Sequence, residues 1–444
     1  MLRIGFYATL ISLGVWVGGP PALAQNSSYP PALTDQEVQP SSPVPQAPSQ
    51  ELTFPGTPVP GAPSAAPPSI NSSNQSTMAG PGETPKFYTI TAELRETYDD
   101  NVYTSSNDKV SSFETDIEPS VLFNFPMENS QFSARVSVGG TYYQNESSGN
   151  FEVTSSLLAR FTHQFSDRFA IDVRDEAGYF TEPGLFSDIG TLYRNGSYVS
   201  NTFSTDFTAQ WTPLLSSVTS LSNTVVYYDD SNIATGQDNM QNNFSQSIGF
   251  SIAPKITLVF AGLYSGVSYS DVARGYDSYT GMTGIDWTAL PTLSISTRIG
   301  ASYTLNQGNA FPSPYGSVSV AWQLGKRSNL QFGYSYSVVP TDVVTASGQV
   351  ASRIYTNFAY DISRSWSSHL NLAVTDGDYT NDLVQANTTG TFTEWDTALE
   401  AGLTYHISDH FDTNMGYIFS DVSSDLGFRD YTRNQFYLGI SGSY

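Results

Sequence analysis

The chain has 444 residues, no cysteine, and 41 acidic against 18 basic side chains, for a formal net charge of -23. The acidic balance argues against nucleic-acid binding, which needs a basic surface to neutralise phosphates. The absence of cysteine excludes disulfide scaffolds, thiol catalysis and thiolate metal sites. Only 13% of residues are charged, while Gly, Tyr and Phe number 35, 28 and 26, a composition that favours extended, turn-rich structure.

The first 24 residues have the pattern of a secretory signal peptide. Arg3 precedes an uncharged stretch from Ile4 to Gly19, and Ala22-Leu23-Ala24 forms a small-x-small cleavage site. We expect cleavage after Ala24 and export of the chain. A retained membrane anchor is the weaker alternative because the apolar stretch is short and ends in Gly-Gly-Pro-Pro.

Residues 25–86 contain 14 prolines in 62 residues, among Ser, Ala, Gln and Thr. Such a segment buries too little apolar surface to offset its ordering entropy. We therefore expect a disordered, Pro/Ser-rich periplasmic linker. A binding segment for an SH3-like partner or for cell-wall material is the less favoured alternative.

From residue 87 to 444 the apolar side chains recur with a period of two. Tyr88, Ile90, Ala92 and Leu94, for example, alternate with polar residues, which places the two kinds on opposite faces of a strand. The pattern predicts about 18 strands, within about 16 to 20. The predicted fold class is all-β: a transmembrane antiparallel up-and-down β-barrel.

The predicted connections alternate between short and long. The short ones begin at Pro126, Ser166, Pro213, Pro254, Leu290, Gly325, Ser363 and Ser408. Between them lie longer polar segments, such as Asp99–Val110, Thr181–Ser197, Asp229–Gln241, Asn306–Pro314 and Ser420–Asp430. Short turns at one end and long loops at the other are typical of outer-membrane barrels, whereas Greek-key sandwiches mix connection lengths.

Tryptophan and histidine gather near the predicted short turns. Four tryptophans are expected to form an aromatic girdle at a lipid interface: Trp211, Trp287, Trp322 and Trp366. The histidines are expected near the same rim: His163, His369, His406 and His410. The predicted turn breaks the helical spacing that His406 and His410 would need to share a metal. We expect no metal, no cofactor and no catalytic residue, and therefore not an enzyme.

Seven arginines fall on the polar face of their predicted strands, where the lumen of a barrel would accept them more readily than lipid. With acidic residues of the same face they are the pore-lining candidates: Arg95, Arg135, Arg160, Arg174, Arg298, Arg353, Arg433, Glu114, Asp116, Glu118, Glu394, Asp396 and Glu400. Because closure brings both ends of the sequence together, we expect Arg95, Arg135, Arg160 and Arg174 to meet the three last carboxylates. Such a cluster would be a structural ion-pair network or a functional constriction.

Two segments resemble a known family. Glu96–Tyr103, followed by Phe113–Phe125, resembles the opening hairpin of porin-like bacterial outer-membrane β-barrel proteins, some of them associated with exopolysaccharide export. The last strand resembles the assembly signal of such barrels, although this chain ends in Tyr where many end in Phe: Phe436, Leu438, Ile440 and Tyr444. The resemblance implies the outer membrane as location and the barrel-assembly machinery as partner.

The predicted function is a porin-like channel for passive diffusion of small hydrophilic solutes, or assistance to polysaccharide export. The alternative is a structural or surface-interaction barrel with an occluded lumen. Its acidic extracellular loops would contact outer-membrane lipid, lipopolysaccharide, envelope polymer or other cells. The loop Thr181–Ser197 is the longest, and we expect it to fold inward under either hypothesis.

Overall fold

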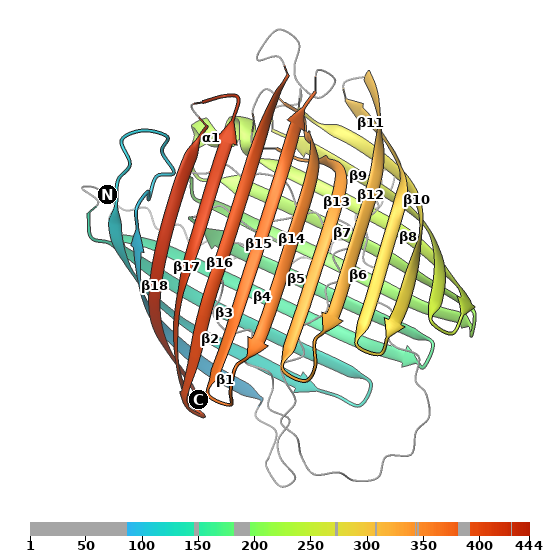
Figure 1. Cartoon of the computed structure of the whole chain (residues 1–444), viewed down its shortest axis with the longest axis horizontal. Helices are drawn as coiled ribbons and strands as arrows, with labels where there is room; N and C mark the ends of the chain where they lie inside the picture. Colours follow the sequence, from blue (N-terminus) through green and yellow to red (C-terminus); the bar gives the residue numbers. More distant parts are fainter. Residues whose placement is uncertain are drawn as a thin grey trace.

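The computed structural model describes residues 87–444 apart from 146–150, 182–195, 271–273, 307–308, 342, 344–345, 381–390 and 428. The predicted signal peptide and linker lie outside the described residues, as does most of Thr181–Ser197. Within the described part the secondary structure is almost all strand (Figure 1).

The period-two segments form strands that alternate in direction. They are β1 (Tyr88–Asp99), β2 (Ser112–Pro126), β3 (Ser130–Tyr143), β4 (Phe151–Ser166), β5 (Phe169–Phe180), β6 (Tyr198–Thr212), β7 (Leu215–Tyr228), β8 (Asn239–Ala253), β9 (Ile256–Tyr269), β10 (Tyr276–Leu290), β11 (Leu293–Asn306), β12 (Asn309–Gln323), β13 (Ser328–Val339), β14 (Gln349–Asp361), β15 (Trp366–Tyr379), β16 (Phe392–Ser408), β17 (Phe411–Ser424) and β18 (Tyr431–Ser443). A short helix, α1 (Ser231–Gln237), stands between β7 and β8. Among the described residues no helix is long and apolar enough to cross a membrane.

The strands form one closed antiparallel barrel. Each pairs with its neighbours in sequence, and β1 also pairs with β18, from Thr91 opposite Ser443 to Asp99 opposite Gln435. Ile90 and Tyr444 continue this ladder with two backbone hydrogen bonds of 3.0 and 2.9 Å. The predicted fold class and strand number are confirmed: the sheet has 18 strands and no free edge. Closure satisfies the backbone groups that an open edge would leave unpaired in lipid.

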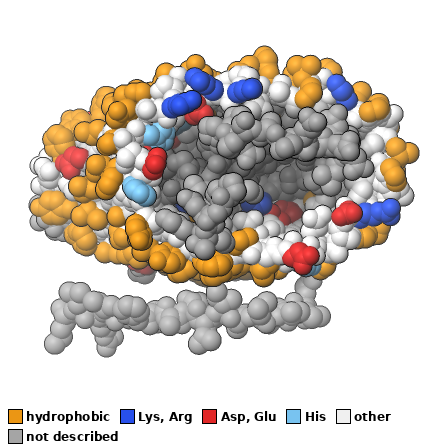
Figure 2. Space-filling model, turned by 90° about the horizontal axis from the view of Figure 1, so that it is seen from below, with side chains coloured by type: hydrophobic (Ala, Val, Ile, Leu, Met, Phe, Trp, Pro, Cys, Tyr) orange, Lys and Arg blue, Asp and Glu red, His pale blue; other side chains and the backbone are white. Residues whose placement is uncertain are grey.

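The two faces of the barrel wall differ in chemistry. Large apolar side chains such as Leu94, Phe203, Ile299 and Leu438 are exposed, and hydrophobic side chains surround the outside of the oval barrel in Figure 2. The alternate residues carry mostly hydroxyl, amide and charged groups. We call the side with the exposed apolar residues the outer face and the other side the inner face. In water so large an apolar exterior would be unfavourable, whereas in a bilayer it contacts hydrocarbon.

Short turns join the strands at one end of the barrel, and long loops join most of them at the other (Figure 1). Five hairpins at the short-turn end contain a register shift just before the turn, at Gln164/Ser166, Gln210/Thr212, Ser251/Ala253, Thr288/Leu290 and His406/Ser408. One extra residue on one strand increases the local twist and lets the chain reverse tightly.

The prediction of a long loop over Asn306–Pro314 is wrong. β11 runs to Asn306 and β12 begins at Asn309, so only two residues separate the strands. Pro312 and Pro314 favoured the prediction of a loop, because proline has no backbone N–H to donate to a neighbouring strand. They are tolerated here because this part of β12 pairs with β11 alone, and its pairing with β13 begins at Gly316. Two other predicted loops are shorter than expected, since β8 begins at Asn239 and β17 extends to Ser424.

The sidedness of the wall predicts opposite tolerances for arginine on the two faces of β11. Ile299 is 68% exposed on the outer face, so Ile299→Arg should lower the free energy of unfolding by about 2–4 kcal/mol, the cost of a charge facing the bilayer midplane. Ser296→Arg is the matched control, because Ser296 lies on the inner face opposite Asp286. Denaturant unfolding of the barrel refolded into liposomes measures both. Equal losses would contradict this assignment of faces.

Candidate functional site: the inner wall of the barrel

All predicted pore-lining residues lie on the inner face. The evidence is that the residues next to them in the strand carry exposed apolar side chains, and successive side chains point to opposite faces. Leu94 beside Arg95, Ile299 beside Arg298 and Ile354 beside Arg353 are examples. The remaining candidates follow by register and alternation: Arg135, Arg160, Arg174, Arg433, Glu114, Asp116, Glu118, Glu394, Asp396 and Glu400.

Charged residues are concentrated on the inner face of β1–β6. Arg95 Nε donates to Asp116 Oδ2 at 3.2 Å. Arg160 and Arg174, which are opposite each other in register, share Asp172, with Nη2 to Oδ2 distances of 2.6 and 3.0 Å. The carboxylate between the two guanidiniums offsets the repulsion between these like charges in adjacent strands. The arginines of β1, β4 and β5 therefore form ion pairs with carboxylates on the same strand or on the next strand.

The expected ion-pair cluster between the N-terminal arginines and the β16 carboxylates is not what the described contacts show. Glu394 instead accepts hydrogen bonds from Nε and Nη2 of Arg429, at 2.6 and 2.9 Å. Arg429 belongs to the β17–β18 loop. Glu400 accepts from Asn371 at 2.9 Å and contacts His369 at 3.1 Å. The reason is distance around the wall, because β17 and β18 stand between β16 and β1.

Tyr437 of β18 bridges the two charged regions. Its ring centroid lies 5.6 Å from the guanidinium carbon of Arg95, and its hydroxyl interacts with Glu400. An aromatic ring with a polar end can contact a cation through its face and a carboxylate through its hydroxyl. The two ends of the sequence do meet after closure, but a tyrosine rather than a direct ion pair connects them.

The inner face of β7–β9 has the opposite character. These three strands contain no acidic or basic residue. The inner faces of β7 and β8 carry mostly hydroxyl and amide groups, some of which bond across the ladder, as Asn243 does to Ser222 at 3.3 Å and Gln241 to Ser265 at 3.3 Å. The inner face of β9 is uncharged but mostly apolar. The pore-lining residues predicted from the sequence are all charged, so they include none from this neutral wall. The sequence signal for it is the absence of charge in three successive strands, with serine, threonine, asparagine and glutamine frequent at the alternate positions of β7 and β8.

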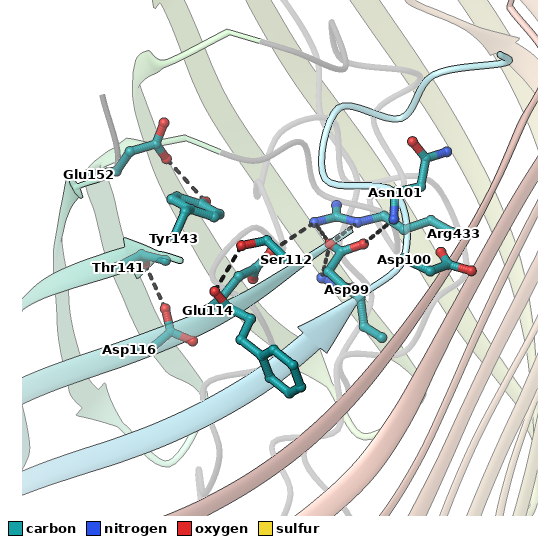
Figure 3. Close-up of polar contacts among 12 residues, drawn as sticks. Asp99, Asp100, Asn101, Ser112, Glu114, Asp116, Thr141, Tyr143, Glu152 and Arg433 are labelled. Atoms are coloured by element: carbon teal, nitrogen blue, oxygen red, sulfur yellow. Dashed lines mark hydrogen bonds and ion pairs between the residues drawn. The ribbon is translucent and has the colours of Figure 1, made fainter. Parts of the chain in front are cut away.

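The motif that resembles the family's opening hairpin forms a polar clasp across the β1–β18 seam (Figure 3). Asp99, fully buried, accepts from Arg433 Nε at 2.6 Å and from Gln435 Nε2 at 3.1 Å. Asp100 accepts from the backbone and side-chain nitrogens of Asn434, each at 2.7 Å. The side chain of Asn101 donates to the carbonyl of Thr432 at 3.0 Å. Three consecutive residues at the end of β1 and just after it thus bind the start of β18.

Glu114 extends the clasp toward β2, with Oε1 at 4.0 Å from Arg433 Nη2. Arg433 is 2% exposed, so this guanidinium is buried between two carboxylates of neighbouring strands. Buried charges of this kind need such partners to offset their desolvation. Two of the pore-lining candidates, Arg433 and Glu114, therefore belong to barrel closure at the long-loop end.

The four girdle tryptophans lie on the outer face near the short turns. Trp211, Trp287 and Trp322 are exposed, and Trp366 packs on Tyr405 with ring centroids 4.7 Å apart. Trp211 Nε1 donates to Ser217 Oγ at 2.8 Å, which satisfies its polar group where the ring meets the interface. Their contact with lipid headgroups stays a prediction.

The histidines lie toward the short-turn end but on different faces. His163 is on the outer face and contacts Ser130 at 2.7 Å, whereas His369 and His406 are on the inner face. His406 contacts Asp412 across the β16–β17 hairpin at 2.7 Å, and His410 lies in the following turn. Within the described ranges no group of three or more histidine or carboxylate side chains could hold a metal ion.

The clasp predicts a large effect of Arg433 on stability. Arg433→Met should cost about 3–5 kcal/mol, because it leaves the buried Asp99 without its counter-ion. Arg160→Met is the control: its pair with Asp172 is partly exposed, at 35% and 21% for the two side chains, and should contribute at most about 1 kcal/mol. The temperature at which the folded band disappears from a heat-modifiability gel ranks the variants. Similar shifts for both would rule out a special role for the clasp.

A model of the family described as "Putative beta-barrel porin 2" matches residues 302–444. The match includes the terminal strand but not the opening hairpin. No curated protein matches this chain.

The chain is similar at low identity to solved outer-membrane proteins. OpdK from Pseudomonas aeruginosa has 9% identity and a TM-score of 0.45, covering 80% of this chain and 99% of that one. OccAB4 from Acinetobacter baumannii has 11% identity and a TM-score of 0.43, covering 80% and 98%. OccK2 from Pseudomonas aeruginosa, solved with glucuronate, has 10% identity and a TM-score of 0.44, covering 80% and 97%. These likenesses say nothing of what this chain binds.

The resemblance predicted from the sequence is confirmed over the C-terminal third of the chain, which is similar to a porin family. The closed barrel and its apolar outer face, together with this similarity, place the chain in the bacterial outer membrane.

Proposed function

We propose that this barrel is a channel for passive diffusion of small hydrophilic solutes across the outer membrane. The observation that carries the proposal is the closed 18-stranded wall with a hydrophilic inner face. Barrels of about 16 to 18 strands are wide enough to leave an aqueous channel, whereas eight-stranded ones are filled by side chains. The outer face would contact lipid, and β18 would present the assembly signal to the barrel-assembly machinery.

The distribution of charge on the inner wall supports a preference among solutes. Carboxylates on the inner face of β1–β6 include Glu93, Glu118, Glu176 and Asp206 in addition to those paired with arginine. Acidic groups therefore exceed basic ones there, which favours cations. Within the neutral wall of β7–β9, the inner faces of β7 and β8 offer hydroxyl and amide groups that can exchange hydrogen bonds with uncharged polar solutes as they pass.

The proposal predicts open steps with a preference for cations over anions in a planar bilayer. Replacing Glu118 and Glu176 by Gln and Asp206 by Asn should reduce this preference, because it removes negative charge that faces the channel. Glu96→Gln is the matched control, since Glu96 lies on the outer face, where it accepts from Thr115 at 2.7 Å. Reversal potentials under a salt gradient measure the selectivity of each variant.

Two results would contradict the proposal. A refolded wild-type barrel that shows no conductance and no swelling of liposomes in small sugars would favour a structural or surface-interaction barrel. A change in selectivity for Glu96→Gln as large as that of the triple variant would show that the inner-face carboxylates do not set the selectivity.

A further inference from the structure

The tip of the β13–β14 hairpin leaves the barrel wall. β13 pairs with β12 only as far as Tyr336, opposite Gly316. Beyond that point β12 carries Pro314 and Pro312, which have no N–H to donate, and it pairs with β11 alone. The two prolines thus end the β12–β13 ladder early and free the hairpin tip from its neighbour.

The freed tip folds across the inside of the long-loop end. Val338 packs against a cluster formed by Val267, Tyr269 and Tyr276 on β9 and β10, although β11 and β12 separate these strands from β13 in the wall. A contact that skips two strands is possible only on the inner side of the barrel. Val343 and Ala346, in the connection between β13 and β14, pack in turn against Tyr379 and Phe392 of β15 and β16.

Arg274 ties this tip to two other long connections. The residue precedes β10, is 0% exposed, and lies with its guanidinium carbon 4.0 Å from the ring centroid of Tyr269. Its Nε donates to the carbonyl of Ala346 at 3.0 Å and its Nη2 to that of Thr341 at 2.7 Å. Its Nη1 donates to the carbonyl of Gly236 at the end of α1. Tyr269 adds a hydroxyl bond to Thr341 at 3.1 Å.

Arginine suits this position because its planar group presents several donors in a fixed fork and stays charged. Three carbonyls of two other connections can be bonded at once, and the aromatic ring covers the face of the guanidinium. A lysine has one nitrogen at the end of a flexible stem and cannot reproduce the arrangement.

We propose that Arg274 is a positioning residue that holds the β13–β14 tip across the long-loop mouth and thereby sets the size limit for solutes. This inference rests on the proposed channel function. We expected Thr181–Ser197 to fold inward, but most of that loop lies outside the described residues. Among the described residues, the connection between β13 and β14 folds inward.

Two readouts test the proposal, one of them independent of conduction. The chain has no cysteine, and Ser347 is 0% exposed within the tip, so Ser347→Cys supplies a single, nearly isosteric probe for a membrane-impermeant maleimide. The second readout is the rate of liposome swelling in a series of sugars of increasing size. Both are measured in the Arg274→Ala and Arg274→Lys backgrounds. Arg168→Ala, in the β4–β5 turn at the opposite end, is the matched control.

In Arg274→Ala we expect the thiol introduced at position 347 to react faster by about tenfold or more, because a local opening loses the contacts that oppose it. Larger sugars should enter the liposomes while the rate for the smallest changes little. Arg274→Lys should behave like the alanine variant, and Arg168→Ala like the wild type. Unchanged labelling and an unchanged size limit would overturn the proposal, as would rescue of both by lysine.

Further outcomes separate this inference from the channel function. A silent wild type that conducts after Arg274→Ala would refute the open channel and support the role of Arg274. Faster labelling without any change in passage would overturn the assignment of the size limit to Arg274. If Arg274→Ala does not refold, Tyr269→Phe removes the hydroxyl bond to Thr341 and should raise the labelling rate in the same direction; no rise there would count against the proposal.

Discussion

The structure depends on the need to satisfy every backbone hydrogen-bonding group in a solvent that offers none. In hydrocarbon an unpaired strand edge costs several kcal/mol for each exposed group, so a sheet must close on itself. The pairing of β1 with β18 meets this need along the ladder from Thr91 to Asp99. The clasp of Asp99, Asp100 and Asn101 on β18 secures the seam at the long-loop end, where the ladder stops.

Closure also determines what the inner wall can do. Once every strand exposes its apolar row to lipid, the alternate row is enclosed, and its composition decides which solutes the interior tolerates. This barrel separates the two kinds of polar lining. Charged groups are most concentrated on β1–β6, where some form pairs such as Arg95 with Asp116, while β7–β9 carry only neutral groups. The paired charges stabilise the wall, and the excess of carboxylates gives the interior its sign.

The ladder between β12 and β13 stops short of the long-loop mouth. Pro312 and Pro314 stop the pairing of β12 with β13, and the released tip is bonded by the buried guanidinium of Arg274. The ladder bonds lost there are thus partly replaced by hydrogen bonds from a side chain to the carbonyls of the tip. In the sequence these prolines predict a loop, and for this reason the boundary between β11 and β12 was predicted wrongly.

The amino-acid sequence was enough to predict the strand number, the closed barrel and the face on which each of the seven strand arginines lies. A period of two and the cost of charge in lipid are local properties. Only the tertiary structure decided which charges pair, that Tyr437 stands between Arg95 and Glu400, and that Arg274 joins three connections. These contacts depend on register and on the path of loops through space. Residues such as Arg274 and Thr341 are far apart in the chain, and no periodicity relates them.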